Sequence, residues 1–381
     1  MGVQVVINGN QYTIRGEKTV TTAAKECGIP LNPGDLISIR GNVLQRHEGE
    51  PFSATVNGNE VTDYNQRLHD GDVVMLGDGK DIVEEYESYL VYTEHSAVSA
   101  GTGAIRVFTR EGSDGVIEVR TGSLSGEVVE KLKAEPIDLV CTNYTPDVGD
   151  EKVIALTFDD GPSEAYTAAI LDILAANDAK ATFFAVGTQI EKGQGAELVR
   201  RAVAEGNLVC SHTYSHANAQ GNSANLANLD GVDQRGQVEK GIQAITDALN
   251  GGEQEEKPQE SQPLFGIFGQ KAEEPEPVEA SHIVRLPGGI SDKNVMLNVY
   301  DLVDAEIGWN LDTGDWVMPG KDAIVEVLLS VEPGDIVLMH DGGGDRSQTV
   351  EALREALPKL VKKGYRFITI EELLEYPALN R

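Results

Sequence analysis

The carboxyl-terminal part of the chain alternates between apolar strand-like runs and helix-like segments. Residues 153–158 read Val-Ile-Ala-Leu-Thr-Phe, a nearly continuous apolar run, and residues 165–176 have helical periodicity. A strand without polar alternation is buried on both faces, and such strands separated by helices form parallel sheets. The sequence therefore predicts an α/β domain over residues 151–381, on a parallel sheet or barrel. Further strands are expected at residues 181–186, 208–210, 283–285, 336–339 and 366–368.

The segments before this domain are β-rich and divide into two predicted modules. The first covers residues 1–84, and the second covers residues 85–150. Short alternating runs separated by Asn-Gly and Asp-Gly turns are typical of strands joined by tight turns. Strands are expected at residues 3–7, 36–40, 53–56, 73–76, 103–110 and 115–120, and a helix at residues 19–27.

One segment interrupts the α/β alternation. Residues 250–281 are rich in Glu and Pro, with a short apolar patch at residues 264–268. Such a composition cannot bury enough apolar surface to offset the entropy lost on ordering. The sequence predicts a flexible acidic insertion inside the domain.

The charge balance excludes several function classes. Asp and Glu number 62 against 31 Lys and Arg, which gives a formal net charge of -31. So acidic a surface repels phosphate backbones and anionic membranes, so we expect no nucleic-acid partner. No apolar run is long enough for a transmembrane helix, and residues 1–10 show no signal peptide. Nothing in the sequence indicates the oligomeric state.

Two carboxylates follow the first predicted strand of the α/β domain. Asp159 and Asp160 stand directly before the turn Gly161-Pro162. Because α/β folds place their sites at the carboxyl ends of parallel strands, the pair is a candidate site. Asp, Gly and Pro are also ordinary turn formers, so the motif taken alone is better explained as a turn.

Two histidines four residues apart, His212 and His216, favour the functional interpretation. On a helix this spacing places both rings on one face, where they can share a metal ion. Together with one strand-end carboxylate they provide three protein ligands and leave a coordination position open for water. The sequence thus predicts a catalytic type of metal centre.

With these residues in place, the domain resembles the polysaccharide deacetylases of the NodB-homology type, carbohydrate esterase family four. The resemblance covers residues 152–376 and implies a distorted (β/α)7-type barrel. It rests on motifs in a fixed order, at residues 157–162, 212–216, 285–289, 312–316 and 338–346.

The resemblance implies a role for each residue around the metal. Asp160, His212 and His216 would hold Zn²⁺ or another divalent transition metal. Asp159 would act as the general base, and Arg285 would keep it charged and oriented.

It also implies the remaining parts of an amide-hydrolysing site. His340 would protonate the leaving amine, with Asp315 as its partner. The Gly288 N–H would stabilise the oxyanion, and Pro287, which has no N–H, would fix the loop. Trp316 and Leu338 would form an apolar pocket for the acetyl methyl group.

The sequence departs from the family pattern at two places. Gly288 stands where an aromatic residue is common, so a sugar-contacting ring is expected to be missing. Cys210 and Ser211 precede His212 where Gly and Asn are usual. Cys27, Cys141 and Cys210 are interpreted as buried thiols, with Cys210 as a stray metal ligand the less favoured alternative.

The two amino-terminal modules carry weaker resemblances. Residues 1–84 are similar to the ubiquitin-like (β-grasp) modules of cell-wall proteins, through Thr19-Val20 and residues 28–35. Residues 85–150 are similar to the G-five modules proposed to bind N-acetylglucosamine. A plain β spacer explains the second module equally well.

Together these features predict a metal-dependent N-deacetylase of N-acetylated glycan. Peptidoglycan is the favoured substrate because of the cell-wall character of the amino-terminal resemblances, and chitin-like polymers remain open. The family implies an extracytoplasmic or cell-wall location. Two alternatives remain: a non-catalytic glycan-binding cell-wall protein, and an O-deacetylase or deformylase acting on another sugar.

Overall fold

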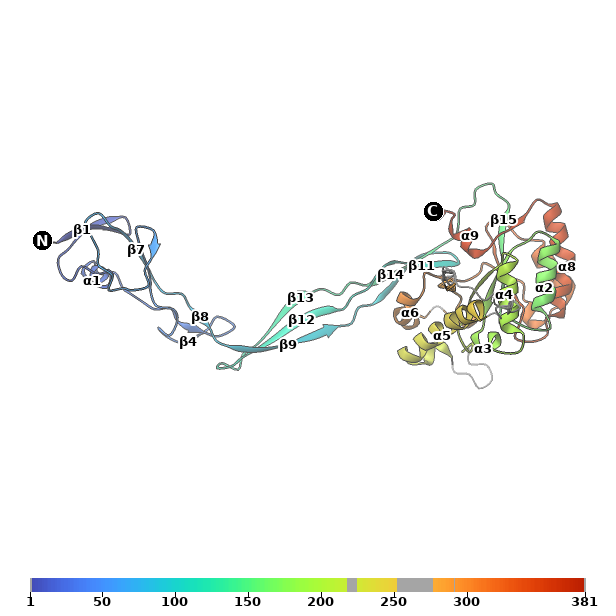
Figure 1. Cartoon of the computed structure of the whole chain (residues 1–381), viewed down its shortest axis with the longest axis horizontal. Helices are drawn as coiled ribbons and strands as arrows, with labels where there is room; N and C mark the ends of the chain where they lie inside the picture. The colour runs from blue at the N-terminus through green and yellow to red at the C-terminus, as the bar shows by residue number, and fades with distance from the viewer. Residues whose placement is uncertain (1, 218–224, 252–276, 291, 380–381) are drawn as a thin grey trace, which may run out of the picture. The chain divides into compact units, whose positions relative to one another are not determined.

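The computed structural model describes residues 2–217, 225–251, 277–290 and 292–379. The chain divides into two compact units, shown in Figure 1. The first unit contains Met1–Glu94 and Asp114–Pro136, and the second contains His95–Ser113 and Ile137–Arg381. The stretch 85–150, which the sequence pattern treats as one module, is therefore shared between both units.

The second unit is built on a curled sheet of parallel strands. Their order across the sheet is β19-β18-β17-β16-β15-β21-β20, and every neighbouring pair is parallel. No ladder joins β19 to β20 within the described residues, so the expected barrel is an open half-barrel. The strands are β15 (Val153–Asp159), β16 (Ala181–Ala185), β17 (Leu208–Ser211), β18 (Ile283–Val284), β19 (Ala305–Ile307), β20 (Leu311–Asp312) and β21 (Ile336–His340).

Strand β15 is buried on both faces, as its apolar run predicts. Leu156 and Phe158 pack with Ile170 of a helix in the main core. The alternate residues, such as Ala155, face a second apolar cluster that contains Phe184. Helices pack around the sheet (Figure 1): α2 (Thr167–Ala176), α3 (Gly187–Ile190), α4 (Gly195–Ala204), α5 (Gly231–Asn250), α6 (Lys293–Val299), α7 (Lys321–Leu328), α8 (Ser347–Lys362) and α9 (Ile370–Leu374).

Strands from the preceding segment extend this sheet beyond β19. β11 (Ile105–Arg110) pairs antiparallel with β19, and β14 (Leu139–Tyr144) and β10 (Ala97–Gly101) follow it. Arg106 of β11 forms an ion pair with Glu306 of β19, with 2.8 Å between Nη1 and Oε2. A further strand, β22 (Arg366–Phe367), pairs in parallel with the first two residues of β15.

The first unit begins with a small sheet and one helix. The sheet order is β2-β1-β7-β5-β6, and the helix α1 (Val20–Glu26) is capped by the Thr19 side chain. Val20 and Ala23 of the helix lie in the apolar core of this sheet. The strands are β1 (Val3–Ile7), β2 (Asn10–Ile14), β5 (Ser53–Val56), β6 (Asn59–Glu60) and β7 (Val73–Gly77). β1, β5 and β7 lie on predicted runs, whereas the sequence pattern predicts no strand at β2 or β6.

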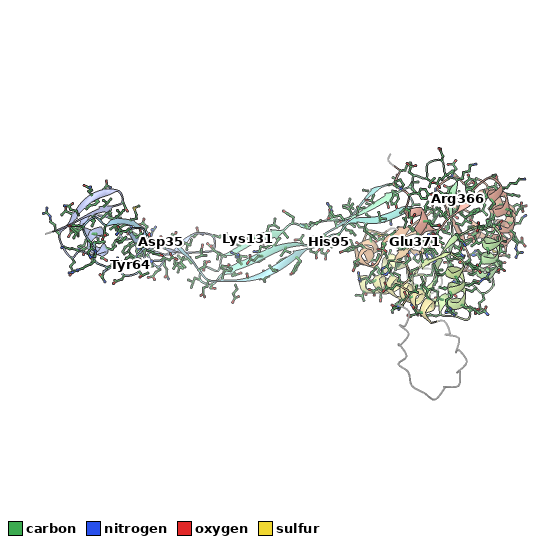
Figure 2. All side chains as sticks on the ribbon, turned by 45° about the horizontal axis from the view of Figure 1, so that its top comes forward. Asp35, Tyr64, His95, Lys131, Arg366 and Glu371 are labelled. Atoms are coloured by element: carbon green, nitrogen blue, oxygen red, sulfur yellow. The ribbon has the colours of Figure 1, made fainter. Side chains whose placement is uncertain are left out.

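The rest of the first unit is thin. A second small sheet joins β3 (Leu36–Ile37), β4 (Val43–Gln45) and β8 (Ile82–Val83). A three-stranded sheet joins β9 (Tyr86–Thr93), β12 (Gly115–Gly122) and β13 (Val128–Ala134). Around Lys131 the side chains of this sheet project outward, and no second layer from the described residues covers them (Figure 2).

Most of the predicted acidic insertion, at residues 252–276, lies outside the described residues, and the apolar patch 264–268 is among them. Among the helices that the structure describes, none combines the length and the hydropathy needed to cross a membrane.

Candidate active site

The predicted site residues gather where the parallel strands end. The register of β15 and β21 places Asp159 directly beside His340. The register of β17 and β18 pairs Ser211 with Val284, so His212 and Arg285 follow at the same edge. The topology alone thus brings together four residues that are far apart in the sequence.

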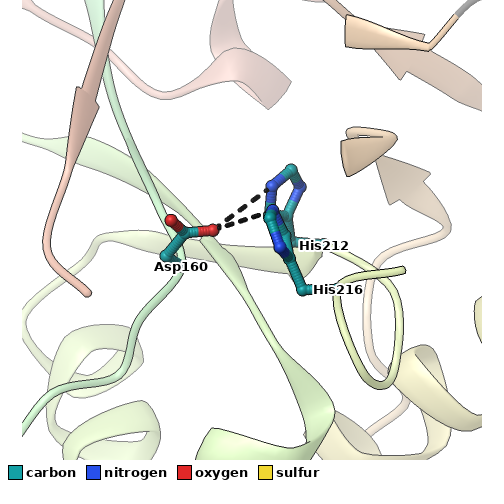
Figure 3. A group of neighbouring side chains, drawn as sticks. All are labelled: Asp160, His212 and His216. Atoms are coloured by element: carbon teal, nitrogen blue, oxygen red, sulfur yellow. Dashed lines mark ion pairs between the residues drawn. The ribbon is translucent and has the colours of Figure 1, made fainter. Parts of the chain in front are cut away.

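Asp160, His212 and His216 form a compact group of potential metal ligands, drawn in Figure 3. The Oδ1 atom of Asp160 lies 3.0 Å from Nε2 of His216 and 3.7 Å from Nε2 of His212. This Oδ1 is buried and accepts no hydrogen bond within the described part of the chain. A buried carboxylate oxygen without a donor, facing two imidazole nitrogens, fits a divalent cation.

The two histidines lie on a loop after β17, not on one face of a helix. Thr213 and His216 have left-handed φ angles of 65° and 53°, and Asp160 has one of 73°. Non-glycine residues in this region are strained, and such strain is concentrated at functional sites. The ring centroids lie 4.9 Å apart, so the loop brings the two imidazoles together although they do not lie on a helix.

The second nitrogen of His212 is fixed by the backbone. Nδ1 lies 2.8 Å from the carbonyl oxygen of Arg285, so this nitrogen donates and Nε2 is left with its lone pair toward Asp160. Burial lowers the pKa of His212 to about 3, which keeps the ring neutral. A neutral imidazole oriented by a carbonyl is the form that binds zinc.

Asp159 is held by a buried arginine. Nη1 of Arg285 donates to Oδ1 of Asp159 at 2.7 Å and to the Thr157 hydroxyl at 2.8 Å. Nε and Nη2 donate to the carbonyl oxygens of Ile307 and Gly308, and the guanidinium lies over the Phe184 ring. Four of the five guanidinium N–H groups are thus used, and Oδ2 of Asp159 is left facing His212, 3.6 Å from Nε2.

His340 and Asp315 form the second acid–base pair. Nδ1 of His340 lies 2.8 Å from Oδ1 of Asp315, and the His340 backbone N–H and Thr349 hydroxyl both donate to Oδ2. Burial disfavours the charged forms of both side chains, but the hydrogen bond and charge attraction between them stabilise those forms by more. The pKa of His340 is raised and that of Asp315 is lowered.

A cavity of about 330 Å³ joins these groups. Trp316, 57% exposed, and buried Leu338 line it together with Gly288, whose φ angle is 65°. Pro287 is buried and does not line the cavity, while Arg285 and Asp315 support it from behind. The lining residues are Asp159, Asp160, His212, His216, Gly288, Trp309, Asp312, Trp316, Leu338, His340, Gly343 and Arg346.

Cys210 does not belong to the metal group. Its side chain is fully buried in the apolar cluster with Phe184 and Ile283, and burial raises the pKa of its thiol. The interpretation as a small buried residue is therefore confirmed.

Several residues that line or support the cavity received no role from the sequence, among them Trp309, Arg346 and Asp341. Trp309 brings an indole to the cavity beside Gly288, and Arg346 donates through Nε to the Gly342 carbonyl. Asp341 is buried behind the Gly161-Pro162 turn and accepts a hydrogen bond from Thr167. Burial raises the pKa of Asp341 to about 7. Asp341 and Arg346 belong to the motif at residues 338–346, whereas Trp309 lies outside all five motifs.

Comparisons with known proteins find relatives among the polysaccharide deacetylases, the family that the motifs resemble. The family profile described as Polysaccharide deacetylase matches residues 147–255. A peptidoglycan-N-acetylglucosamine deacetylase of Bacillus cereus is 35% identical over 229 residues, covering 59% of this chain and 90% of that protein. A chitooligosaccharide deacetylase of a Bradyrhizobium species is 31% identical over 250 residues, covering 62% of this chain and 97% of that protein.

A solved structure of a peptidoglycan N-acetylglucosamine deacetylase aligns with a TM-score of 0.48 and 27% identity, covering 62% of this chain and 94% of that one. The sequence relatives, matched over nearly their whole length, decide the assignment. The chain belongs to the polysaccharide deacetylase family, and these relatives are named as peptidoglycan and chitooligosaccharide deacetylases.

Proposed function

We propose that this chain removes acetyl groups from the amide nitrogens of an N-acetylated glycan and releases acetate. The observation that supports it is the convergence of Asp160, His212 and His216 with two acid–base pairs around one cavity. Zn²⁺ or another divalent transition metal, bound to these three residues, would supply Lewis-acid polarisation of the acetamide carbonyl and a lowered pKa for water.

Asp159 acts as the general base in this proposal. Arg285 occupies Oδ1, so Oδ2 is the oxygen that can accept a proton from the attacking water. Because Arg285 is held by three further acceptors, the carboxylate cannot rotate without breaking a buried network.

His340 acts as the general acid. Asp315 fixes its Nδ1, so Nε2 is the nitrogen that delivers a proton to the leaving amine. The raised pKa of His340 keeps that proton present near neutral pH. The backbone N–H of Gly288 is assigned to the oxyanion, and Trp316 with Leu338 to the acetyl methyl group.

Peptidoglycan is the proposed substrate class. Its support is the named activity of the Bacillus cereus relatives, together with the cell-wall resemblance of residues 1–84 and 85–150. On the same support we propose a location at the cell wall or outside the cell. We assign the amino-terminal β-grasp-like and G-five-like segments to holding the enzyme on its polymer.

The test is acetate release from purified peptidoglycan and from N-acetylglucosamine oligomers. Release should stop with a chelator, return with zinc, and be absent from O-acetylated substrates. Binding of glycan without acetate release would instead identify a non-catalytic cell-wall protein. Release from O-acetylated or N-formylated sugar alone would identify the other alternative.

A further inference from the structure

The arginine beside the proposed base is bound by the end of a strand that β11 supports from its other edge. Arg285 donates through Nε to the Ile307 carbonyl at 2.9 Å and through Nη2 to the Gly308 carbonyl at 2.8 Å. Ile307 is the last residue of β19, and it pairs across the sheet with Ile105 of β11. The Gly308 N–H donates to the Ala104 carbonyl at 2.7 Å. The backbone of β11 and the residue before it thus hold the two peptide groups that accept from Arg285.

A buried ion pair fastens the same two strands to each other. Nη1 of Arg106 lies 2.8 Å from Oε2 of Glu306, and the two side chains are 17% and 8% exposed. No other ion pair of Glu306 occurs in the part of the chain that the structure describes. A carboxylate left at this depth without its cation would be strongly destabilising, because its charge would be neither solvated nor paired. Arg106 therefore keeps β19 seated against β11.

Arg106 is itself held in place from the neighbouring strands. Its Nε donates to Oδ1 of Asn143 in β14 at 2.8 Å, and the Asn143 amide donates to the Ser99 hydroxyl of β10 at 2.6 Å. All three strands lie ahead of residues 147–255, which the family profile matches. Arg106 does not line the active-site cavity, so any effect it has on the reaction passes through other residues.

We propose that Arg106 is a positioning residue for the deacetylation reaction. It holds β19 through Glu306, and the end of β19 holds Arg285 in register with Asp159. A small displacement of the base from its reacting position lowers the rate even when its cause lies far from the chemistry. The inference rests on the proposed function, since it assigns Arg106 to the general base of that reaction. Strand β11 then contributes to catalysis by orienting the base.

The first experiment measures acetate release by Arg106→Gln and by Arg110→Gln, the matched control at an exposed position of the same strand. We expect Arg106→Gln to lower kcat about tenfold, with KM and zinc content within about twofold of the wild type. Arg106→Lys, which keeps the charge, should recover most of the rate, and Arg110→Gln should change nothing. An unchanged kcat for Arg106→Gln, or a change of KM alone, overturns the inference.

A double-mutant cycle separates positioning from a general loss of structure. In the Asp159→Asn background no base remains to be oriented, so adding Arg106→Gln should lower the residual rate by less than about twofold. A substitution that only destabilises the fold would lower the rate by the same factor in both backgrounds. An equal factor therefore overturns the inference.

The hold on Arg285 is also measurable without turnover. Exchange of its Nε–H with water, followed by NMR on the zinc-loaded protein, should be faster in Arg106→Gln, because the Ile307 acceptor is held less firmly. Unchanged exchange in this variant overturns the inference. Absence of acetate release from the wild type would instead overturn the proposed function, and the exchange measurement would still test the contact between β11, β19 and Arg285.

Discussion

Strands β15 and β9 show how differently one chain uses extended backbone. Every residue of β15 (Val153–Asp159) is buried, whereas every residue of β9 (Tyr86–Thr93) is exposed. Both are rich in apolar and aromatic residues, so strand propensity does not separate them. The difference is the second layer: helices cover the sheet of β15, and nothing in the described residues covers that of β9.

This contrast explains where the chemistry is placed. Two covered faces allow β15 to hold Asp159 against a buried arginine, where the ion pair is shielded from water. The comparable pair in the thin sheet, Glu118 with Arg120, has an arginine side chain that is 25% exposed. Because water screens such a pair, it contributes little stability and cannot hold a reacting carboxylate as firmly.

The largest expected effect is the loss of the carboxylate in the buried pair, compared with the same loss in the exposed pair. Asp159→Asn should lower kcat by about 10³-fold while metal content is kept, because the base is lost and the ligands remain. Glu118→Gln, the same change in the thin sheet, should leave kcat unchanged. Acetate release and metal analysis on both variants check this, and a near-normal rate for Asp159→Asn would remove it from the base role.

Metal affinity separates the two regions in the same way. His212→Ala should weaken metal binding by about 100- to 1000-fold, since one of three ligands is removed. His69→Ala, an exposed histidine of the first unit, should leave it unchanged. Competition with a chromophoric chelator measures both. Equal affinity in the two variants would place the metal elsewhere.

Matched leucines test the packing difference directly. Leu156→Ala in β15 should lower the free energy of unfolding of the second unit by about 3 kcal/mol, because the residue is fully buried. Leu90→Ala in β9 should cost within about 0.5 kcal/mol, because Leu90 is 50% exposed. Urea unfolding followed by circular dichroism compares them, and similar losses would contradict the layered account.

The smallest effect concerns pH. Asp315 raises the pKa of His340, so Asp315→Asn should move the alkaline limit of kcat to lower pH. The limit moves to lower pH because His340 must be protonated to act as the acid, and its pKa falls when the Asp315 carboxylate is removed. Thr349→Val, which removes only a hydrogen bond to Asp315, should shift the limit less. An unchanged profile of kcat against pH would exclude His340 as the acid.

Much of the second unit could be predicted because its signals are local. An apolar run such as residues 153–158 identifies a buried strand, and Asp159-Asp160 marks its end. The β15–β21 register, which pairs Asp159 with His340, then follows from the way parallel strands end together. Asp160 and His212 come close for the same reason, because each follows a strand of the one parallel sheet.

The remaining features depend on long-range pairing or on backbone conformation. The ladder between β11 and β19 joins Arg106 to Glu306, and no local pattern in either strand indicates that partner. The loop of His212 and His216 depends on left-handed φ angles that residue spacing does not encode. Trp309 follows β19, a strand that the sequence pattern does not predict, so no signal in the sequence singles it out.

The central claim is that one divalent cation binds between the strand-end carboxylate and the two loop histidines. Anomalous diffraction from crystals of the protein grown with zinc tests it most directly. The account predicts one strong peak about 2 Å from a carboxylate oxygen of Asp160 and from Nε2 of His212 and His216. A peak bound by other residues, with these three side chains left apart, would contradict it.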